Sequence, residues 1–170
     1  GAIEFTPRPT ALFLPASIGN AVQQAAALIT EGDYEAALPL AIRDRESQGA
    51  IFNPNAYYYE ALAQLGLNQE AEALDTLNNA QERLDNFDGV NAEDAVIYQP
   101  LIDIGFAEVY LKRGEDLIDA GNRGAAASPL AQARDSAEAA LSADPRYARA
   151  YEIIARSYLL ENNYQGAIDV

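Results

Sequence analysis

The chain has 170 residues, 49% of them hydrophobic and 22% charged, which is enough apolar content to bury the core of one ordinary globular domain. It has no cysteine and no histidine, which excludes disulfides, thiolate metal sites and the commonest general base. The net charge of −15 is spread evenly, with 12 acidic and 4 basic residues in 1–85 and 14 and 7 in 86–170, so we expect no nucleic-acid partner.

Residues 1–16, GAIEFTPRPTALFLPA, contain three prolines. Because each proline fixes φ and removes a backbone donor, this segment is predicted to be an extended arm. Leu12, Phe13 and Leu14 are too apolar for a free tail, since burial of each is worth about 1.5 to 3 kcal/mol. We expect the arm to lie against a helical surface of this chain or of a neighbouring one.

From residue 17 onward, apolar residues recur at helical spacing, interrupted by short turns rich in Gly, Asn, Asp and Pro. The order predicted is a helix A, a tight turn, a helix B and a looser turn, repeated along the chain. The A helices are predicted at 17–31, 54–66, 91–120 and 146–161, and the B helices at 33–49, 69–86, 122–143 and from 163 onward. No run approaches the ~18 apolar residues of a membrane span, so membrane insertion is not expected.

One pattern recurs in these helix pairs: a large residue, then a small residue, an apolar or aromatic residue, and a small residue after the turn. Its copies are Tyr151, Ile154, Ala155, Tyr158 and Ala167; Tyr110, Gly114, Leu117 and Ala126; Tyr57, Ala61 and Ala73; and, more weakly, Ala21, Ala25, Leu28 and Ala37. The pattern resembles the tetratricopeptide repeat (TPR). The resemblance implies an all-α solenoid of helix-turn-helix repeats, a right-handed superhelix of about four irregular repeats. These would span about 18–53, 54–90, 91–144 and 145–170, with the last one truncated.

The copies depart from the family in their spacing. Ala21, Tyr57, Tyr110 and Tyr151 lie 36, 53 and 41 residues apart, against about 34 in the family. The long gap is explained by an N-terminal extension of the third A helix, which Pro100 would either kink or split into two helices. Pro39 and Pro129 recur in two of the B helices, so the solenoid is expected to be irregular.

Metal binding and catalysis are not expected, and no cofactor is predicted. The segment Asp85–Asp94 surrounds Gly89 with acids, but the EF-hand spacing would place its first and last ligands on Leu84 and Ala95. The chain offers no Ser/His/Asp or Cys/His arrangement and no Gly-rich phosphate loop. We therefore expect a protein that is not an enzyme.

The resemblance implies that a protein or peptide partner lies in the groove lined by the A helices. The groove positions are predicted to be Tyr58, Leu62, Leu65, Leu111, Glu115, Glu152 and Arg156, together with Val22, Ala26 and Leu159. TPR proteins that bind the C-terminal tails of chaperones present Lys and Asn at these positions. Because this chain has other residues there, binding of a chaperone tail is not expected. In the run of Tyr57, Tyr58 and Tyr59, the first matches a packing position, which leaves Tyr58 or Tyr59 for the groove; the alternative is that all three pack against neighbouring helices.

The function expected is a non-catalytic scaffold for protein interaction, as a piece or subunit of a larger assembly. The alternative is a structural subunit that assembles head-to-tail through its open solenoid end and its arm. The residues predicted to self-associate are Leu12, Phe13, Leu14, Ile154, Tyr158 and Ile168. The absence of Cys and Met and the single lysine favour an extracytoplasmic place (periplasm, cell surface or secreted) over the cytoplasm.

Overall fold

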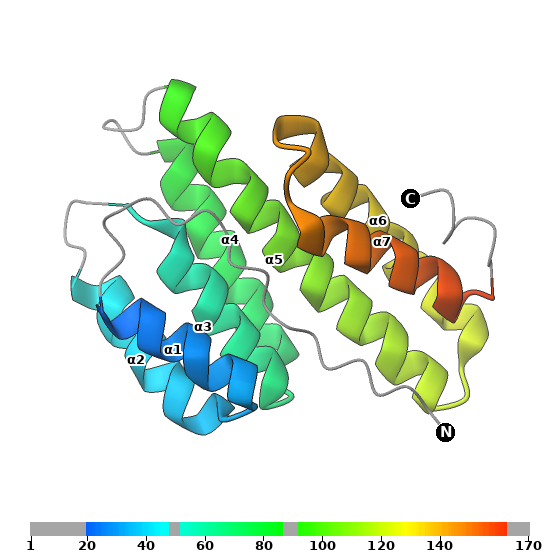
Figure 1. The fold of residues 1–170 in the computed structure, drawn as a ribbon. Coiled ribbons are helices and arrows are strands. Elements are labelled where there is room, and N and C mark those ends of the chain that lie inside the picture. Colours follow the sequence, from blue (N-terminus) through cyan, green and yellow to red (C-terminus); the bar gives the residue numbers. More distant parts are fainter. Residues whose placement is uncertain (1–19, 48–51, 87–91, 163–170) are drawn as a thin grey trace.

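The structure, a computed structural model, describes residues 20–47, 52–86 and 92–162 and contains seven α-helices and no strand in these ranges (Figure 1). The helices are α1 (Asn20–Glu31), α2 (Tyr34–Ser47), α3 (Pro54–Gly66), α4 (Glu70–Asn86), α5 (Ala92–Asp119), α6 (Arg123–Ala143) and α7 (Ala148–Leu160). The all-α prediction is confirmed, and these seven helices begin and end within three residues of the predicted bounds. The predicted arm and the helix predicted from 163 onward lie outside the described residues. None of the helices in the described ranges has the length and apolar character needed to cross a membrane.

The helices pack in the order in which they occur in the chain. Each helix contacts the next one, and the odd-numbered helices also contact one another: α1 packs on α3, α3 on α5, and α5 on α7. Among the described residues, the even-numbered helices make no such contacts with each other. Figure 1 shows α5 running between α1–α4 on one side and α6 and α7 on the other. Helix α5 is therefore the central element of the packing.

Each of the four turns that end an odd-numbered helix contains one residue with a positive φ. These residues are Gly32 (φ 82°), Asn68 (φ 59°), Gly121 (φ 78°) and Asn162 (φ 61°). Glycine and asparagine are the residues that most readily adopt this left-handed conformation. Their spacings are 36, 53 and 41 residues, the same as those of the four repeat positions predicted from the sequence, so each lies 11 residues after its repeat position.

Three of these turns also share their hydrogen bonds. The left-handed residue donates its N–H to the carbonyl three residues back, at 2.9 to 3.1 Å, and the next residue donates to the carbonyl five residues back, at 2.8 to 2.9 Å. This pair of bonds is the Schellman motif, which satisfies carbonyls at the end of a helix. In the fourth turn, Asn162 donates to the Leu159 carbonyl at 3.0 Å in the same way.

Small residues recur at fixed distances from the left-handed residue. Seven residues before the left-handed residue the chain has Ala25, Ala61, Gly114 and Ala155, and five residues after it the chain has Ala37, Ala73 and Ala126. All of them are buried except Ala155, which is half-buried. At Gly114 the approach is close enough that an added Cβ would lie 2.5 Å from Leu130 Cδ2 of α6. Small side chains let helix backbones come this near.

Helix α5 accounts for the long spacing between the second and third repeat positions. It has 28 residues and starts 18 residues before Tyr110, whereas α3 and α7 each start three residues before Tyr57 and Tyr151. The N-terminal extension is thus confirmed. The helix continues through Pro100, so the alternative of two separate helices is wrong.

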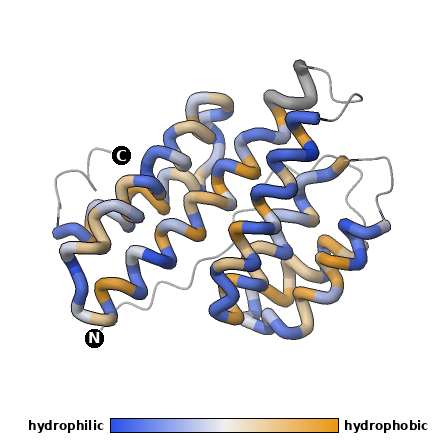
Figure 2. Tube along the Cα trace, turned by 180° about the vertical axis from the view of Figure 1, so that it is seen from behind, coloured by the Kyte–Doolittle hydropathy of each residue, from blue (hydrophilic) through white to orange (hydrophobic). Residues whose placement is uncertain are grey.

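Most of the buried apolar side chains form one cluster that draws on α1, α2, α3, α5, α6 and α7, while α4 packs with α3 and α5 in two smaller clusters. Figure 2 shows hydrophobic and hydrophilic residues alternating along the helices, as expected where one face packs on a neighbour and the other meets water. Helix α3, which contacts α1, α2, α4 and α5, is the exception, because it is buried almost all round.

Candidate partner-binding face

Of the ten predicted groove positions, Val22 and Ala26 lie on α1, and the other eight come from three helices that pack in sequence, α3, α5 and α7. We call the surface at these positions the odd-helix face. Four of the ten are buried: Val22 is 0% exposed, Tyr58 4%, Leu65 8% and Leu111 3%. The other six, Ala26, Leu62, Glu115, Glu152, Arg156 and Leu159, are half-buried or exposed. The structure therefore divides the predicted site into a buried part and an accessible part.

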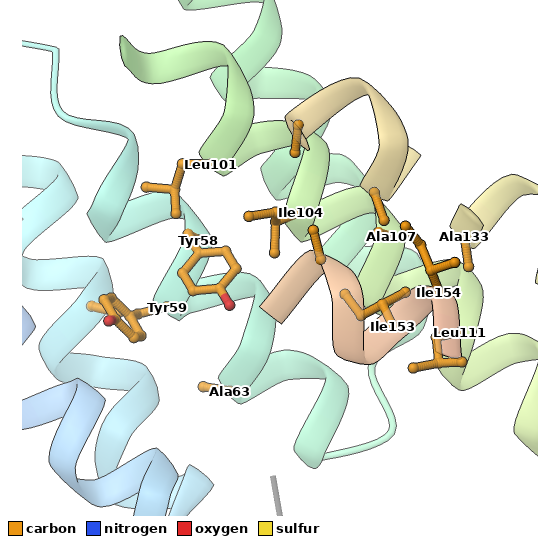
Figure 3. Close-up of a cluster of buried hydrophobic side chains, with 14 of the residues drawn as sticks. Tyr58, Tyr59, Ala63, Leu101, Ile104, Ala107, Leu111, Ala133, Ile153 and Ile154 are labelled. Atoms are coloured by element: carbon orange, nitrogen blue, oxygen red, sulfur yellow. The ribbon is translucent and has the colours of Figure 1, made fainter. Parts of the chain in front are cut away.

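Tyr58 and Leu111 belong to the main core cluster. Figure 3 shows Tyr58 on the side of α3 that faces Ile104 of α5, with Leu111 further along near Ile153 of α7. Leu65 lies elsewhere, in the cluster formed with Leu77 of α4. In this structure these three predicted groove side chains contribute to the core, and a role for them in binding remains a prediction.

All three tyrosines of the 57–59 run are buried. Tyr57 packs with Phe52 and accepts a hydrogen bond from Arg83 Nη1 at 2.8 Å. The rings of Tyr58 and Tyr59 meet edge to face, with their centroids 5.2 Å apart. Burial raises the pKa of Tyr59, and it raises the pKa of Tyr58 well above the ordinary value, with the Glu108 carboxylate adding to the rise. The expectation that Tyr58 or Tyr59 is left open toward a groove is corrected: packing occupies all three.

Charged side chains join α5 to α7. Arg149 donates two hydrogen bonds to Glu108, from Nε to Oε1 at 2.5 Å and from Nη2 to Oε2 at 2.8 Å. A third, from Nη1, reaches Glu152 Oε2 at 2.9 Å. The side chains of Arg149 and Glu108 are only 13% and 10% exposed. Burial alone lowers the pKa of Arg149, but the two carboxylates outweigh it, so the net shift is upward and the guanidinium stays charged.

A second pair lies two helical turns further on. Arg156 Nε is 2.5 Å from Glu115 Oε1, an ion pair whose N–H is not aligned for a hydrogen bond, so that this buried oxygen has no hydrogen-bond partner. Burial raises the pKa of Glu115, and the charge of Arg156 opposes that rise. Both pairs join residues 41 apart in the sequence, so α5 and α7 lie parallel and in register at both points.

Glu108 and Arg149 were not among the residues predicted for the site. A usable signal was present in the sequence: each lies seven residues before a predicted residue, Glu115 and Arg156, and residues two turns apart share a helix face. In each pair, a glutamate of one helix is followed 41 residues later by an arginine of the other. This repeated spacing of opposite charges indicates that the two helices are in contact.

Between α5 and α7, the two arginines of the odd-helix face are paired with three carboxylates. Arg149 and Arg156 each contact at least one carboxylate, so neither is free to hold an anionic group. Within the described ranges, no three acidic side chains come close enough together to hold a metal ion.

The residues predicted to self-associate divide in a similar way. Ile154 is 4% exposed and lies in the main core, so it is already covered within the chain, contrary to the expectation of an intermolecular contact. Tyr158 is half-buried beneath the guanidinium of Arg134 of α6, which lies 4.5 Å from the ring centroid. Leu12, Phe13, Leu14 and Ile168 lie outside the described residues.

Comparison of the chain with models of known protein families, with curated proteins and with solved structures finds no match. The function is therefore inferred from the geometry of the helices and of the odd-helix face.

Proposed function

We propose that the chain is a TPR-like module that binds a protein or peptide partner on the odd-helix face and has no catalytic role. The observation that carries the proposal is the packing of α1, α3, α5 and α7 in sequence, one on the next, which is the arrangement of an extended stack of helix pairs. Extended surfaces of stacked helix pairs suit the binding of polypeptide segments.

Three features support the TPR-like part of the proposal. The same left-handed turn recurs 11 residues after each repeat position. Small residues recur on both sides of that turn, at fixed distances from it. The two Glu–Arg pairs join α5 to α7 at one constant offset, as expected when successive repeats stack in parallel.

The charges of the face bear on the kind of partner. Because both arginines between α5 and α7 are already paired, an acidic segment would gain little there, and the net charge of −15 would repel it. Glu152 has 42% of its side chain exposed and is the most open carboxylate of the face. A partner segment that is uncharged or carries a basic side chain opposite Glu152 is therefore favoured.

The alternative, a subunit that assembles head-to-tail, finds less support in the described residues. The exposed positions of α1 are mostly polar: Gln23, Gln24, Ala27, Thr30 and Glu31. A polar face of this kind does not complement the apolar residues that α7 exposes at the other end, Tyr151 and Leu159.

The proposal is tested by selecting peptides from a displayed random library against the full chain, then measuring their affinity for two variants. In one, Glu152→Arg and Arg156→Ala change the odd-helix face; in the control, Glu72→Arg makes a charge change at an exposed position of α4. We expect the selected peptides to bind the face variant at least tenfold more weakly and the control as the parent. If the control loses affinity and the face variant keeps it, or if the library yields no binder at all, the proposal is wrong.

A further inference from the structure

Helix α7 exposes an apolar stripe. Among the described residues, the large hydrophobic side chains that are exposed are Ile97, Tyr151 and Leu159, at 57%, 39% and 49%. Two of the three are on α7, and the exposed Ala148 and half-buried Ala155 lie between and beside them. Positions 148, 151, 155 and 159 are three or four residues apart, so they form one continuous line along the helix.

The corresponding line on α5 is covered. The residues 41 positions earlier are Ala107, Tyr110, Gly114 and Ile118, and each is buried or half-buried. Helix α6 packs over part of this line, with Leu130 of α6 placed against Gly114. The α7 stripe is thus the face that another helix covers at the preceding repeat. Scattered exposed hydrophobic residues need no explanation, but a continuous line at a packing position marks an interaction surface.

The spacing of the stripe is self-complementary. Ala155 is its small central residue, with Tyr151 one turn before it and Leu159 one turn after it. If two α7 helices cross antiparallel at Ala155, Tyr151 of each copy lies opposite Leu159 of the other, and the alanines let the backbones approach closely. The one charged residue beside the stripe, Glu152, would lie about 4.5 Å along the axis from the crossing in each copy, on opposite sides, so the two carboxylates do not meet.

We propose that the chain forms a two-fold symmetric dimer in which α7 packs antiparallel against α7 of a second copy through Tyr151, Ala155 and Leu159. A closed pair uses the same surface twice, whereas a head-to-tail chain joins two different surfaces. The stripe shares Leu159 with the predicted groove positions and lies beside Glu152, whereas Leu62 and the Glu115–Arg156 pair lie outside it, so the dimer would cover the α7 edge of the odd-helix face and leave the rest of that face open.

The test is the mass of the full chain by light scattering coupled to size exclusion, over a range of concentrations. We expect about twice the chain mass of 18.3 kDa for the parent, and the mass of a monomer for Ala155→Arg and for Leu159→Asp, with helical content and melting temperature measured in parallel. Ile97→Asp is the matched control: it places the same charge on an equally exposed hydrophobic position of α5 and should leave the dimer intact.

Three results would overturn the dimer. The parent could be a monomer at every concentration; the stripe variants could remain dimeric; or Ile97→Asp could dissociate the dimer as strongly as Leu159→Asp. A monomeric parent that loses stability on Leu159→Asp would show that the stripe is covered from within the same chain instead.

Discussion

The residues between α5 and α7 show how buried charges are accommodated in this protein. The side chains of Arg149 and Glu108 are almost completely buried. The free-energy cost of removing their charges from water is offset by two direct hydrogen bonds between them and a third from Arg149 to Glu152. The Glu115–Arg156 pair is less complete, because the contact to Glu115 Oε1 lacks hydrogen-bond alignment. Truncation of one member of the Arg149–Glu108 pair should therefore lower the free energy of unfolding more than truncation of one member of the Glu115–Arg156 pair.

The raised pKa of Glu115 gives a pH dependence of stability with a definite sign. At pH values between the ordinary pKa of 4.5 and the raised pKa, Glu115 binds more protons in the folded state than in the unfolded state. The free energy of unfolding therefore falls as pH rises through this range. In Glu115→Gln this contribution is absent. Urea unfolding of the parent and the variant from about pH 4 to 7 should show the parent losing stability relative to the variant as pH rises. If the parent instead gained stability relative to the variant as pH rises, the charge of Arg156 would lower the pKa of Glu115 more than burial raises it.

Tyr58 is predicted to act as a core residue. Truncation by Tyr58→Ala removes a ring that is 4% exposed, and it should lower the free energy of unfolding by about 3 to 5 kcal/mol, as for other large buried aromatics. The control Ile97→Ala, at a 57% exposed position, should change it by less than about 0.5 kcal/mol. Chemical denaturation measures both. A loss from Tyr58→Ala no greater than that of the control would make Tyr58 a candidate binding residue again.

At the scale of the elements, the pairs α1–α2, α3–α4 and α5–α6 are each joined by the same local turn, and α5–α6 adds a close contact at a small residue. The left-handed Gly or Asn ends the odd helix with a Schellman motif, which turns the chain back. At α5 and α6, the small residue seven positions earlier, Gly114, admits the side chain of Leu130, which is 1% exposed.

Gly114 is predicted to be required for the close packing of α5 on α6. A Cβ added there would lie 2.5 Å from Leu130 Cδ2 and 2.7 Å from Cγ, and the buried Leu130 has little room to move. Gly114→Ala should therefore destabilise the fold by about 1 to 3 kcal/mol, the usual cost of overpacking. The control Gly124→Ala, where no atom lies within 4 Å of the added Cβ, should be neutral or stabilising by about 0.4 to 1 kcal/mol.

A double-mutant cycle with Leu130→Ala identifies the cause. If the clash with Leu130 is responsible, Gly114→Ala should cost much less when Leu130 has been shortened. An equal cost in both backgrounds would exclude this contact as the reason.

At the scale of the whole molecule, stability should be highest at the centre of the array. Helix α5 packs against α3, α4, α6 and α7, whereas α1 contacts only α2 and α3 among the described residues. In stacked helix pairs each element depends on its neighbours, so the terminal elements open first.

Amide hydrogen exchange measured by mass spectrometry should thus show the slowest exchange in the middle of α5 and faster exchange in α1. Uniform protection across all seven helices would show instead that the chain opens only as one cooperative unit. A pattern in which α5 exchanges before α1 would contradict the packing argument.

The sequence by itself determined the helices and their turns. Helical periodicity, together with Gly or Asn at the end of each odd helix, is local information, and residues such as Gly32 and Gly121 adopt their conformation where the apolar periodicity is interrupted. The extension of α5 was predictable for the same reason, since the spacing of repeat positions is counted along the chain. Whether Pro100 bends or splits a helix was left open, because that depends on whether neighbours hold both halves together.

Only the tertiary structure decided which side chains of a predicted face are accessible. Tyr58, Leu65 and Leu111 occupy the register expected of a groove, yet the rotation of α3 and α5 against their neighbours buries all three. The pairing of Arg149 with Glu108 arises in the same way, because an ion pair between two helices depends on their register and separation in space. Periodicity fixes which residues share a helix face, but the packing of that helix on the next one determines whether the face meets protein or water.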